Sequence, residues 1–433
     1  MSKKDRAKDT GAITAWLAAG SSVRLGAYAI FASFCTYFSM YAYRKAFVVG
    51  MYEGQLNILG ALVQTKVAFI IAQLLGYTAS KFWGIKFISE LPGAKRAGAI
   101  VFAIVTAESF LGLFAVAPNW LAVLCLFGNG LALGVVWGLV FGFLEGRRNS
   151  DVLGAGLAAS FIVASGVVKS VGKVVLGWGI DERSMPAVTG LLFLLPIALS
   201  TALLAQLPPP SAEDERWRLP RRPMLDAERK QFFLTFAPGL VALTAAYVLL
   251  SVYRDFRDNF ARELWDALGY ADTPSILATA EIPVALGALL AVGSVMVIKD
   301  SGRALLAVHA LLLMGVLMIG GSTLLFQAGL MGPAAWMITV GLGLYLGYVP
   351  YNCVLFDRML PAVGTAGTAG FMIYLSDSLG YLGSSGVLVY KNFAAPQLPW
   401  LEFMTTLSAL TAGACLILFG LSALYFGRRM RVE

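Results

Sequence analysis

Two adjacent cations stand inside an otherwise apolar stretch of the chain, "SMYAYRKAFVVG", residues 39–50. They are Arg44 and Lys45, and a charge left in membrane hydrocarbon costs several kcal/mol. These side chains therefore either extend to the aqueous interface or line a polar cavity in which a negative group binds them. Because a guanidinium donates two parallel hydrogen bonds to a carboxylate or phosphate, a cavity of this kind predicts an anionic ligand.

A similar arrangement recurs in the second part of the chain, where "VYRDFRDNF" echoes "YRKAFVVG". Three pairs of positions match: Arg44 and Arg254, which follow Tyr43 and Tyr253; Lys169 of "KSVG" and Asp377 of "DSLG"; and, more loosely, Lys66 and Glu281. A repeated pair of arginines is hard to explain as interfacial anchoring. We therefore predict that both arginines bind substrate.

The elements that must position these residues are membrane-spanning helices. The chain has 433 residues, of which 58% are hydrophobic and 13% charged, whereas soluble domains carry about 25% charged residues. Apolar stretches of roughly 20 residues, enough to cross a bilayer, recur along the whole chain. We predict an all-α membrane protein with twelve spans, at residues 24–50, 57–80, 97–115, 119–144, 152–177, 187–206, 232–260, 274–298, 303–326, 333–356, 364–390 and 401–427.

The distribution of basic residues predicts the orientation of the spans. Lysine and arginine concentrate in the N-terminal tail, in 81–96 and in 216–230, whereas the opposite loops contain Arg183, Arg262 and Lys391. The positive-inside rule then places both termini in the cytoplasm. The expected organisation is a tail at 1–23, a six-helix bundle at 24–206, a proline-rich cytoplasmic linker at 207–231, a second six-helix bundle at 232–427 and a tail at 428–433.

Six plus six helices around a cytoplasmic linker is the organisation of the major facilitator fold, whose two bundles are pseudo-symmetric. Within that fold the chain resembles the organophosphate:phosphate antiporters, which exchange glycerol 3-phosphate or hexose phosphates for inorganic phosphate. Four stretches carry the resemblance: "YAYRKAF", "YTASKFWG" at 77–84, "KSVG" at 169–172 and "GTAGTAGFMIYLSDSLGYLGSSG" at 364–386.

The resemblance implies a secondary transporter that works by alternating access, with Arg44 and Arg254 as a two-arginine clamp on the substrate anion. Lys45 and Lys81 match cationic positions of the family motifs, and Lys169 stands where the family has a histidine. The predicted substrate-binding residues are Arg44, Arg254, Lys45, Lys169, Asp377, Tyr43, Tyr253 and Tyr381. The predicted gating or coupling residues are Lys66, Lys81, Glu108, Glu281, Asp255, Arg257 and Asp258.

Departures from the family pattern leave several interpretations open. Lys169 and Asp377 either form a salt bridge between the halves or bind opposite ends of a zwitterion. Asp377 or Glu281 could instead bind a proton, which would make the protein a proton-coupled symporter of a carboxylate or amphiphilic solute. A membrane sensor that binds a phosphorylated metabolite without transporting it is a further alternative.

Other classes of function find no support in the sequence. Nucleophile-elbow, phosphate-loop and zinc-protease motifs are absent, so no enzymatic activity and no cofactor are expected. A metal site is not expected either, because His309 is the one histidine and the four cysteines fall inside predicted spans. The expected partners are a small anionic or zwitterionic solute, inorganic phosphate or a proton as coupled ion, and the bilayer. Nucleic acid is not an expected partner, and a monomer in a bacterial inner membrane is predicted.

Overall fold

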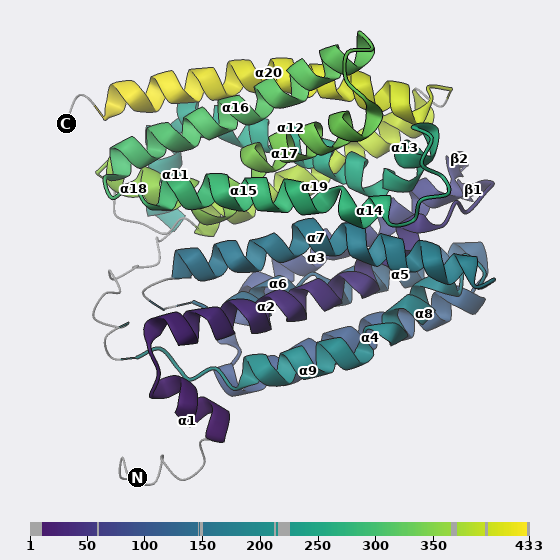
Figure 1. Ribbon diagram of the computed structural model, residues 1–433, viewed down its shortest axis with the longest axis horizontal. Helices are drawn as coiled ribbons and strands as arrows, with labels where there is room; N and C mark the ends of the chain where they lie inside the picture. Colours follow the sequence, from purple (N-terminus) through teal and green to yellow (C-terminus); the bar gives the residue numbers. More distant parts are fainter. Residues whose placement is uncertain are drawn as a thin grey trace.

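The structure, a computed structural model, describes residues 11–58, 60–145, 147, 150–211, 214, 226–364, 370–394 and 397–430. Two groups of helices lie side by side, and both chain ends lie at one end of the molecule (Figure 1). We call that end the terminal side, and the end with the β-hairpin the hairpin side. Most of the predicted linker, the first ten residues of the predicted N-terminal tail and 431–433 of the C-terminal tail lie outside the described residues.

The first group, called the N-half, comes from the chain up to residue 205. Ser21 caps its first long helix by accepting a hydrogen bond from the backbone N–H of Arg24. Its elements are α1 (Ala12–Ala18), α2 (Ser22–Lys45), η2 (Ala46–Val49), β1 (Gln55–Ile58), β2 (Ala61–Gln64), α3 (Thr65–Glu90), η3 (Gly93–Lys95), α4 (Arg96–Val116), α5 (Asn119–Leu133), α6 (Val136–Phe141), α7 (Ser150–Gly177), α8 (Met185–Leu192) and α9 (Leu194–Ala205).

The second group, called the C-half, follows the linker. Asp300 caps its helix α16 by accepting a hydrogen bond from the backbone N–H of Arg303. Its elements are α11 (Asp226–Thr235), α12 (Ala237–Asn259), α13 (Ala261–Ala267), α14 (Ile276–Thr279), α15 (Glu281–Met296), α16 (Ser301–Gln327), α17 (Pro333–Cys353), α18 (Leu355–Ala362), α19 (Gly370–Phe393) and α20 (Trp400–Arg429).

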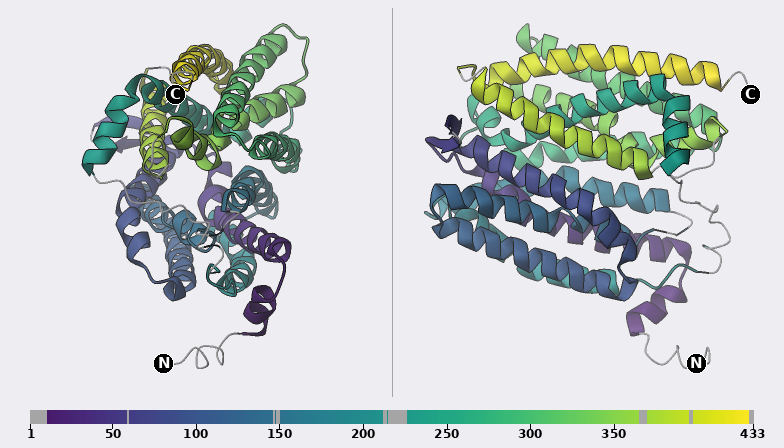
Figure 2. Two further views of the ribbon diagram at one scale, coloured as in Figure 1. Left: turned by 90° about the vertical axis from the view of Figure 1, so that its left-hand side faces the viewer. Right: turned by 180° about the vertical axis from the view of Figure 1, so that it is seen from behind.

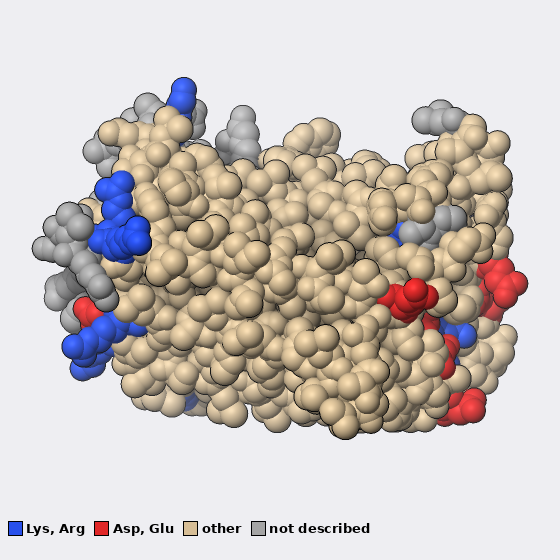
Figure 3. All heavy atoms as spheres, turned by 90° about the horizontal axis from the view of Figure 1, so that it is seen from above, with Lys and Arg blue, Asp and Glu red and all other residues tan. Residues whose placement is uncertain are grey.

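The prediction of an all-α membrane protein with twelve spans is confirmed at the level of the fold. Eight helices are long and apolar enough to cross a membrane alone, and two bent pairs, α8 with α9 and α17 with α18, make up to ten. The remaining two long helices, α3 and α19, have 26 and 24 residues, and polar side chains facing the inside lower their hydropathy. On the face shown in Figure 3, a broad surface without charged residues separates a mainly basic terminal side from a mainly acidic hairpin side.

The prediction for the second span was wrong at its start. Residues 57 and 58 belong to β1 and residues 61–64 form β2, which pairs antiparallel with β1, and Gly60 has a φ of +86°. Apolar residues such as Leu62 and Val63 gave the hairpin the hydropathy of a helix. The helix instead runs from Thr65 to Glu90, so Lys81, predicted at its end, lies well inside it.

Glycines allow close packing of helices at two important contacts. An added Cβ at Gly130 of α5 would lie 2.1 Å from the carbonyl oxygen of Gln73 in α3. An added Cβ at Gly166 of α7 would lie 2.1 Å from the carbonyl oxygen of Leu277 in α14. The first contact holds the N-half together, and the second lets the two halves approach each other on the hairpin side. Figure 2 shows the two halves from two further directions.

Candidate functional site

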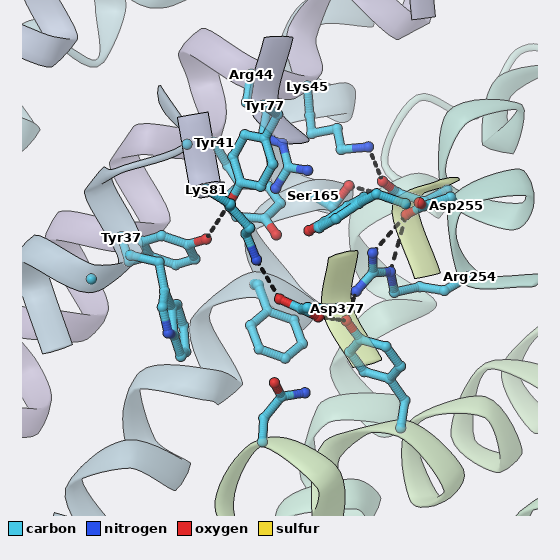
Figure 4. Close-up of a pocket in the computed structure, with 18 of the residues that line it drawn as sticks. Tyr37, Tyr41, Arg44, Lys45, Tyr77, Lys81, Ser165, Arg254, Asp255 and Asp377 are labelled. Carbon is cyan, nitrogen blue, oxygen red and sulfur yellow. Dashed lines mark hydrogen bonds and ion pairs between the residues drawn. The ribbon is translucent and has the colours of Figure 1, made fainter. Parts of the chain in front are cut away.

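A cavity of ≈ 180 Å³ lies between the two halves and is lined by residues of both. It extends from Lys45 and Asp258 on the hairpin side to Phe141 and Asn352, close to the terminal-side ends of α6 and α17. Figure 4 shows its charged and aromatic side chains. The N-half contributes Tyr37, Tyr41, Arg44, Lys45, Tyr77, Lys81, Trp137, Phe141, Phe161 and Ser165, and the C-half contributes Arg254, Asp255, Asp258, Tyr345, Tyr348, Asn352, Asp377 and Tyr381.

Arg44 points into this cavity from the last turn of α2 (Figure 4). The residue is 6% exposed, and its guanidinium carbon lies 3.8 Å from the ring centroid of Tyr77. Within the part of the chain that the structure describes, no carboxylate or hydrogen-bond acceptor binds the guanidinium. The Arg44 guanidinium therefore presents hydrogen-bond donors to the cavity that no acceptor among the described residues binds.

Arg254 extends into the cavity from α12 but is already bound. Its Nη2 and Nε donate to Oδ1 of Asp255 at 2.8 and 3.1 Å, and its Nη1 donates to the hydroxyl of Tyr348. The two arginines therefore differ electrostatically, although the sequence presents them as equivalents. Asp255 neutralises Arg254, so this guanidinium can orient an anion but adds little net attraction.

Lys81 and Asp377 form an ion pair between α3 and α19, nearer the terminal side. Oδ1 of Asp377 also accepts a hydrogen bond of 2.5 Å from the hydroxyl of Tyr247. Tyr381, one helical turn after Asp377, lies with its ring centroid 4.9 Å from the Lys81 ammonium and 5.5 Å from the Tyr77 ring. Both residues line the cavity, so this ion pair joins the N-half to the C-half at the cavity wall.

Asp258 closes the hairpin-side end of the cavity, because two lysines of the N-half bind its single carboxylate. Lys45 Nζ lies 2.6 Å from Oδ2 and also donates to Oδ1 of Asn259 at 2.7 Å. Lys169 and Ser165 both donate to Oδ1 of Asp258. One carboxylate cannot neutralise two ammonium groups, so this cluster keeps one positive charge.

Three more ion pairs surround this closure. Lys66 pairs with Glu263, and Lys173 Nζ lies 2.9 Å from Oδ1 of Asp266; both pairs join the N-half to the C-half. Arg257 and Glu281 pair at 2.8 Å inside the C-half, directly behind the cavity. The contacts between the halves are therefore denser on the hairpin side than around Lys81 and Asp377.

Several residues predicted from the sequence lie outside the cavity. Tyr43 and Tyr253 are buried within their own halves, and the hydroxyl of Tyr253 lies 2.8 Å from that of Ser408. Glu108 faces Tyr43 and Gly190 on the far side of α2, and its Oε2 is buried without a hydrogen-bond partner among the described residues. Tyr43 and Tyr253 point away from the cavity on α2 and α12, whereas Glu108 lies on α4, behind α2.

One of the two open interpretations of Lys169 and Asp377, a salt bridge between them, is not found in the structure. Lys169 pairs with Asp258 and Asp377 pairs with Lys81, so the two residues hold different partners. Lys169 lies toward the hairpin side of α7, whereas Asp377 lies toward the terminal side of α19. Matching positions in repeated halves do not imply contact.

Sequence reasoning missed most of the aromatic lining. Ring centroids of Tyr37 and Trp137 lie 4.9 Å apart, those of Trp137 and Phe161 lie 6.1 Å apart, and those of Phe161 and Tyr345 lie 6.3 Å apart. These rings form a continuous wall from the N-half to the C-half. Helical spacing could have identified two of these tyrosines. Tyr77 lies four residues before Lys81, and Tyr381 lies four residues after Asp377, so each tyrosine shares a helix face with a charged residue of the cavity.

Comparison with solved structures identifies the fold. The chain is similar to a bacterial homolog of the human lysosomal transporter Spinster in an inward-facing and unoccupied conformation, with a TM-score of 0.58, 11% identity and 95% and 98% coverage of the two chains. It is also similar to a D-xylose–proton symporter, with a TM-score of 0.60, 13% identity and 94% and 97% coverage. These likenesses show a major facilitator fold.

Sequence comparison gives the family. No curated protein matches the sequence. A family model described as "Family of unknown function (DUF5690)" matches residues 46–429, from η2 to the end of α20. The match does not include α2, which contributes Tyr37, Tyr41, Arg44 and Lys45 to the cavity. The chain therefore belongs to the DUF5690 family and has the major facilitator fold.

Proposed function

We propose that the protein is a secondary transporter that moves a small organic anion across the membrane by alternating access. The observation that carries this proposal is the buried Arg44 guanidinium, which lines the cavity between the halves without an acidic partner among the described residues. The similar solved structures, a transporter homolog and a symporter, support the transport part of the proposal.

The charges around the cavity favour an anion of one or two negative charges. Asp255 compensates Arg254, and Asp377 compensates Lys81. Arg44 and one of the two lysines on Asp258 are left uncompensated. A phosphate monoester or a carboxylate fits this excess, with Arg44 as the principal arm of the proposed clamp and Arg254 as the second.

Alternating access requires contacts that close one side and then the other. The hairpin side is closed here by the lysine–carboxylate pairs around Asp258 and Glu263. An anion bound at Arg44 lies next to Lys45 and competes with Asp258 for that lysine. We infer that this competition loosens the hairpin-side closure when substrate binds.

The proposed setting is a bacterial inner membrane with both termini in the cytoplasm, as the basic terminal side in Figure 3 supports. In that orientation the present conformation is closed on the outer side. Proton coupling through Asp377 is a second candidate, since this carboxylate lines the cavity and a proton would compete with Lys81 for it. An uncoupler should stop accumulation of the anion only if that candidate is right.

The experiment is uptake into proteoliposomes of the anion that most raises the melting temperature of the purified protein. Arg44→Ala should abolish uptake while the variant keeps its chromatographic profile. Arg303→Gln, which removes an exposed arginine on the terminal side, should transport like the wild type. Uptake by Arg44→Ala at the wild-type rate would exclude Arg44 as the anion-binding group.

A further inference from the structure

We propose that the transported anion carries an aromatic body, as in an aryl phosphate or aryl carboxylate, and is not a sugar or polyol phosphate. This inference rests on the proposed function and names the substrate class of the same site. It depends on the aromatic wall described above and on the scarcity of uncharged polar side chains other than aromatic ones in the cavity.

The anion site and the aromatic wall adjoin each other at Tyr37. The Arg44 guanidinium lies over the Tyr77 ring, and the Tyr77 hydroxyl lies 3.4 Å from that of Tyr37. The Tyr37 ring in turn meets Trp137 edge to face, and Trp137 leads to Phe161. A ligand whose oxyanion binds Arg44 therefore has aromatic faces within reach of its organic body (Figure 4).

A polyol body would find few partners in the same space. Apart from the aromatic residues, the uncharged polar side chains that line the cavity are Ser165 and Asn352, and Ser165 already donates to Asp258. Each sugar hydroxyl that loses water without a replacement hydrogen bond costs binding free energy. An aromatic ring has no such requirement and gains from leaving water.

The tyrosine hydroxyls refine the expected ligand without changing its class. Tyr41, Tyr345 and Tyr381 line the cavity, and their hydroxyls have no hydrogen-bond partner among the described residues. They could serve one or two polar substituents on a ring. Three hydroxyls are too few to replace the water shell of a hexose.

The test is a thermal-shift titration of the full-length protein in detergent with four probes: phenyl phosphate, glycerol 3-phosphate, inorganic phosphate and benzyl alcohol. Phenyl phosphate should bind at least about tenfold more tightly than glycerol 3-phosphate, which corresponds to about 1.4 kcal/mol. Benzyl alcohol should give no shift because it lacks the anion.

The possible failures are distinct. Equal or tighter binding of glycerol 3-phosphate would overturn the aromatic substrate class and leave an anion transporter in place. A shift with benzyl alcohol that exceeds the shift with every anion would overturn the proposed function itself, because Arg44 would then have no part in recognition.

Two phenylalanine variants test whether the aromatic wall causes the preference for phenyl phosphate. Phe161→Ala should weaken phenyl phosphate binding about tenfold and leave the affinity for inorganic phosphate unchanged. Phe102→Ala removes a ring that is 74% exposed on the lipid-facing side of α4 and should change neither affinity. If Phe161→Ala does not fold, the same measurements are made on Trp137→Leu, for which we expect the same result. Equal losses for both ligands would contradict a specific role of the wall.

Discussion

The two halves of the protein present opposite charges to each other. Five lysines of the N-half pair with four acids of the C-half: Lys45 and Lys169 with Asp258, Lys66 with Glu263, Lys81 with Asp377, and Lys173 with Asp266. One contact at the rim, Arg262 with Glu182 at 3.8 Å, has the reverse polarity. The closed hairpin side is therefore an electrostatic contact between a basic face and an acidic face.

This asymmetry explains why the two arginines are not equivalent. Arg254 belongs to the acidic half and takes its partner, Asp255, from its own helix. Arg44 belongs to the basic half, and no acid of the C-half reaches it in the described structure. In the function that we propose, a solute anion binds at this position of the basic face, where no C-half carboxylate pairs with Arg44.

The most buried pair between the halves should give the largest effect. Lys66 and Glu263 have side chains that are 6% and 5% exposed. Glu263→Gln leaves the ammonium buried without its partner, which should destabilise the closed protein by about 3–5 kcal/mol. The double variant Lys66→Met/Glu263→Leu should recover most of the loss, as thermal unfolding in detergent can measure. A single variant as stable as wild type would show that the pair does not hold the halves together.

Asp258→Asn should open the hairpin side by a smaller amount. Two lysines would lose their shared carboxylate, and their mutual repulsion would favour separation of the halves. The measurement is alkylation of a cysteine introduced at Ser170, whose hydroxyl donates to the carbonyl of Pro274 across the interface at 2.8 Å. We expect labelling to be about tenfold faster, equivalent to a shift of about 1.4 kcal/mol between conformations.

The matched control for this opening is Asp300→Asn, which alters an exposed helix cap on the terminal side. It should leave the labelling rate at the Ser170 position unchanged. If Asp258→Asn labels no faster than this control, Asp258 does not close the cavity.

Lys173 and Asp266 should contribute least among the lysine–acid pairs. Their side chains are 13% and 27% exposed, so water and salt screen the attraction. Asp266→Asn should therefore cost about 0.5 kcal/mol, and the cost should disappear in 1 M salt. If Asp266→Asn lowered the free energy of unfolding as much as Glu263→Gln, the contribution of an ion pair would not depend on its burial.

The sequence predicted the helices well, because spans of this length and hydropathy have few alternatives in a membrane. It failed at the β1–β2 hairpin, where Leu62 and Val63 continue the apolar pattern and local hydropathy does not separate strand from helix. That error also moved Lys81 from the interior of α3 to its predicted end.

The candidate site was less accessible to sequence reasoning. The repeated Tyr-Arg pair led to Arg44 and Arg254, which both line the cavity. Their different partners depend on rotation and packing of helices: Asp255 reaches Arg254, while Glu108 lies behind α2 and faces Tyr43. The pairing of Lys169 with Asp258 likewise depends on how α7 meets α12, which no local pattern encodes.

The most direct test of this account is the affinity of the tightest-binding anion for wild type, Arg44→Gln and Arg254→Gln, measured by calorimetry on purified protein. Loss of a buried charged hydrogen-bond donor costs about 2–5 kcal/mol, so Arg44→Gln should weaken binding at least about 30-fold. Arg254→Gln should weaken it about tenfold, because Asp255 already compensates that guanidinium. Wild-type affinity in Arg44→Gln, or a larger loss in Arg254→Gln, would contradict the assignment of Arg44 as the free cation of the basic half.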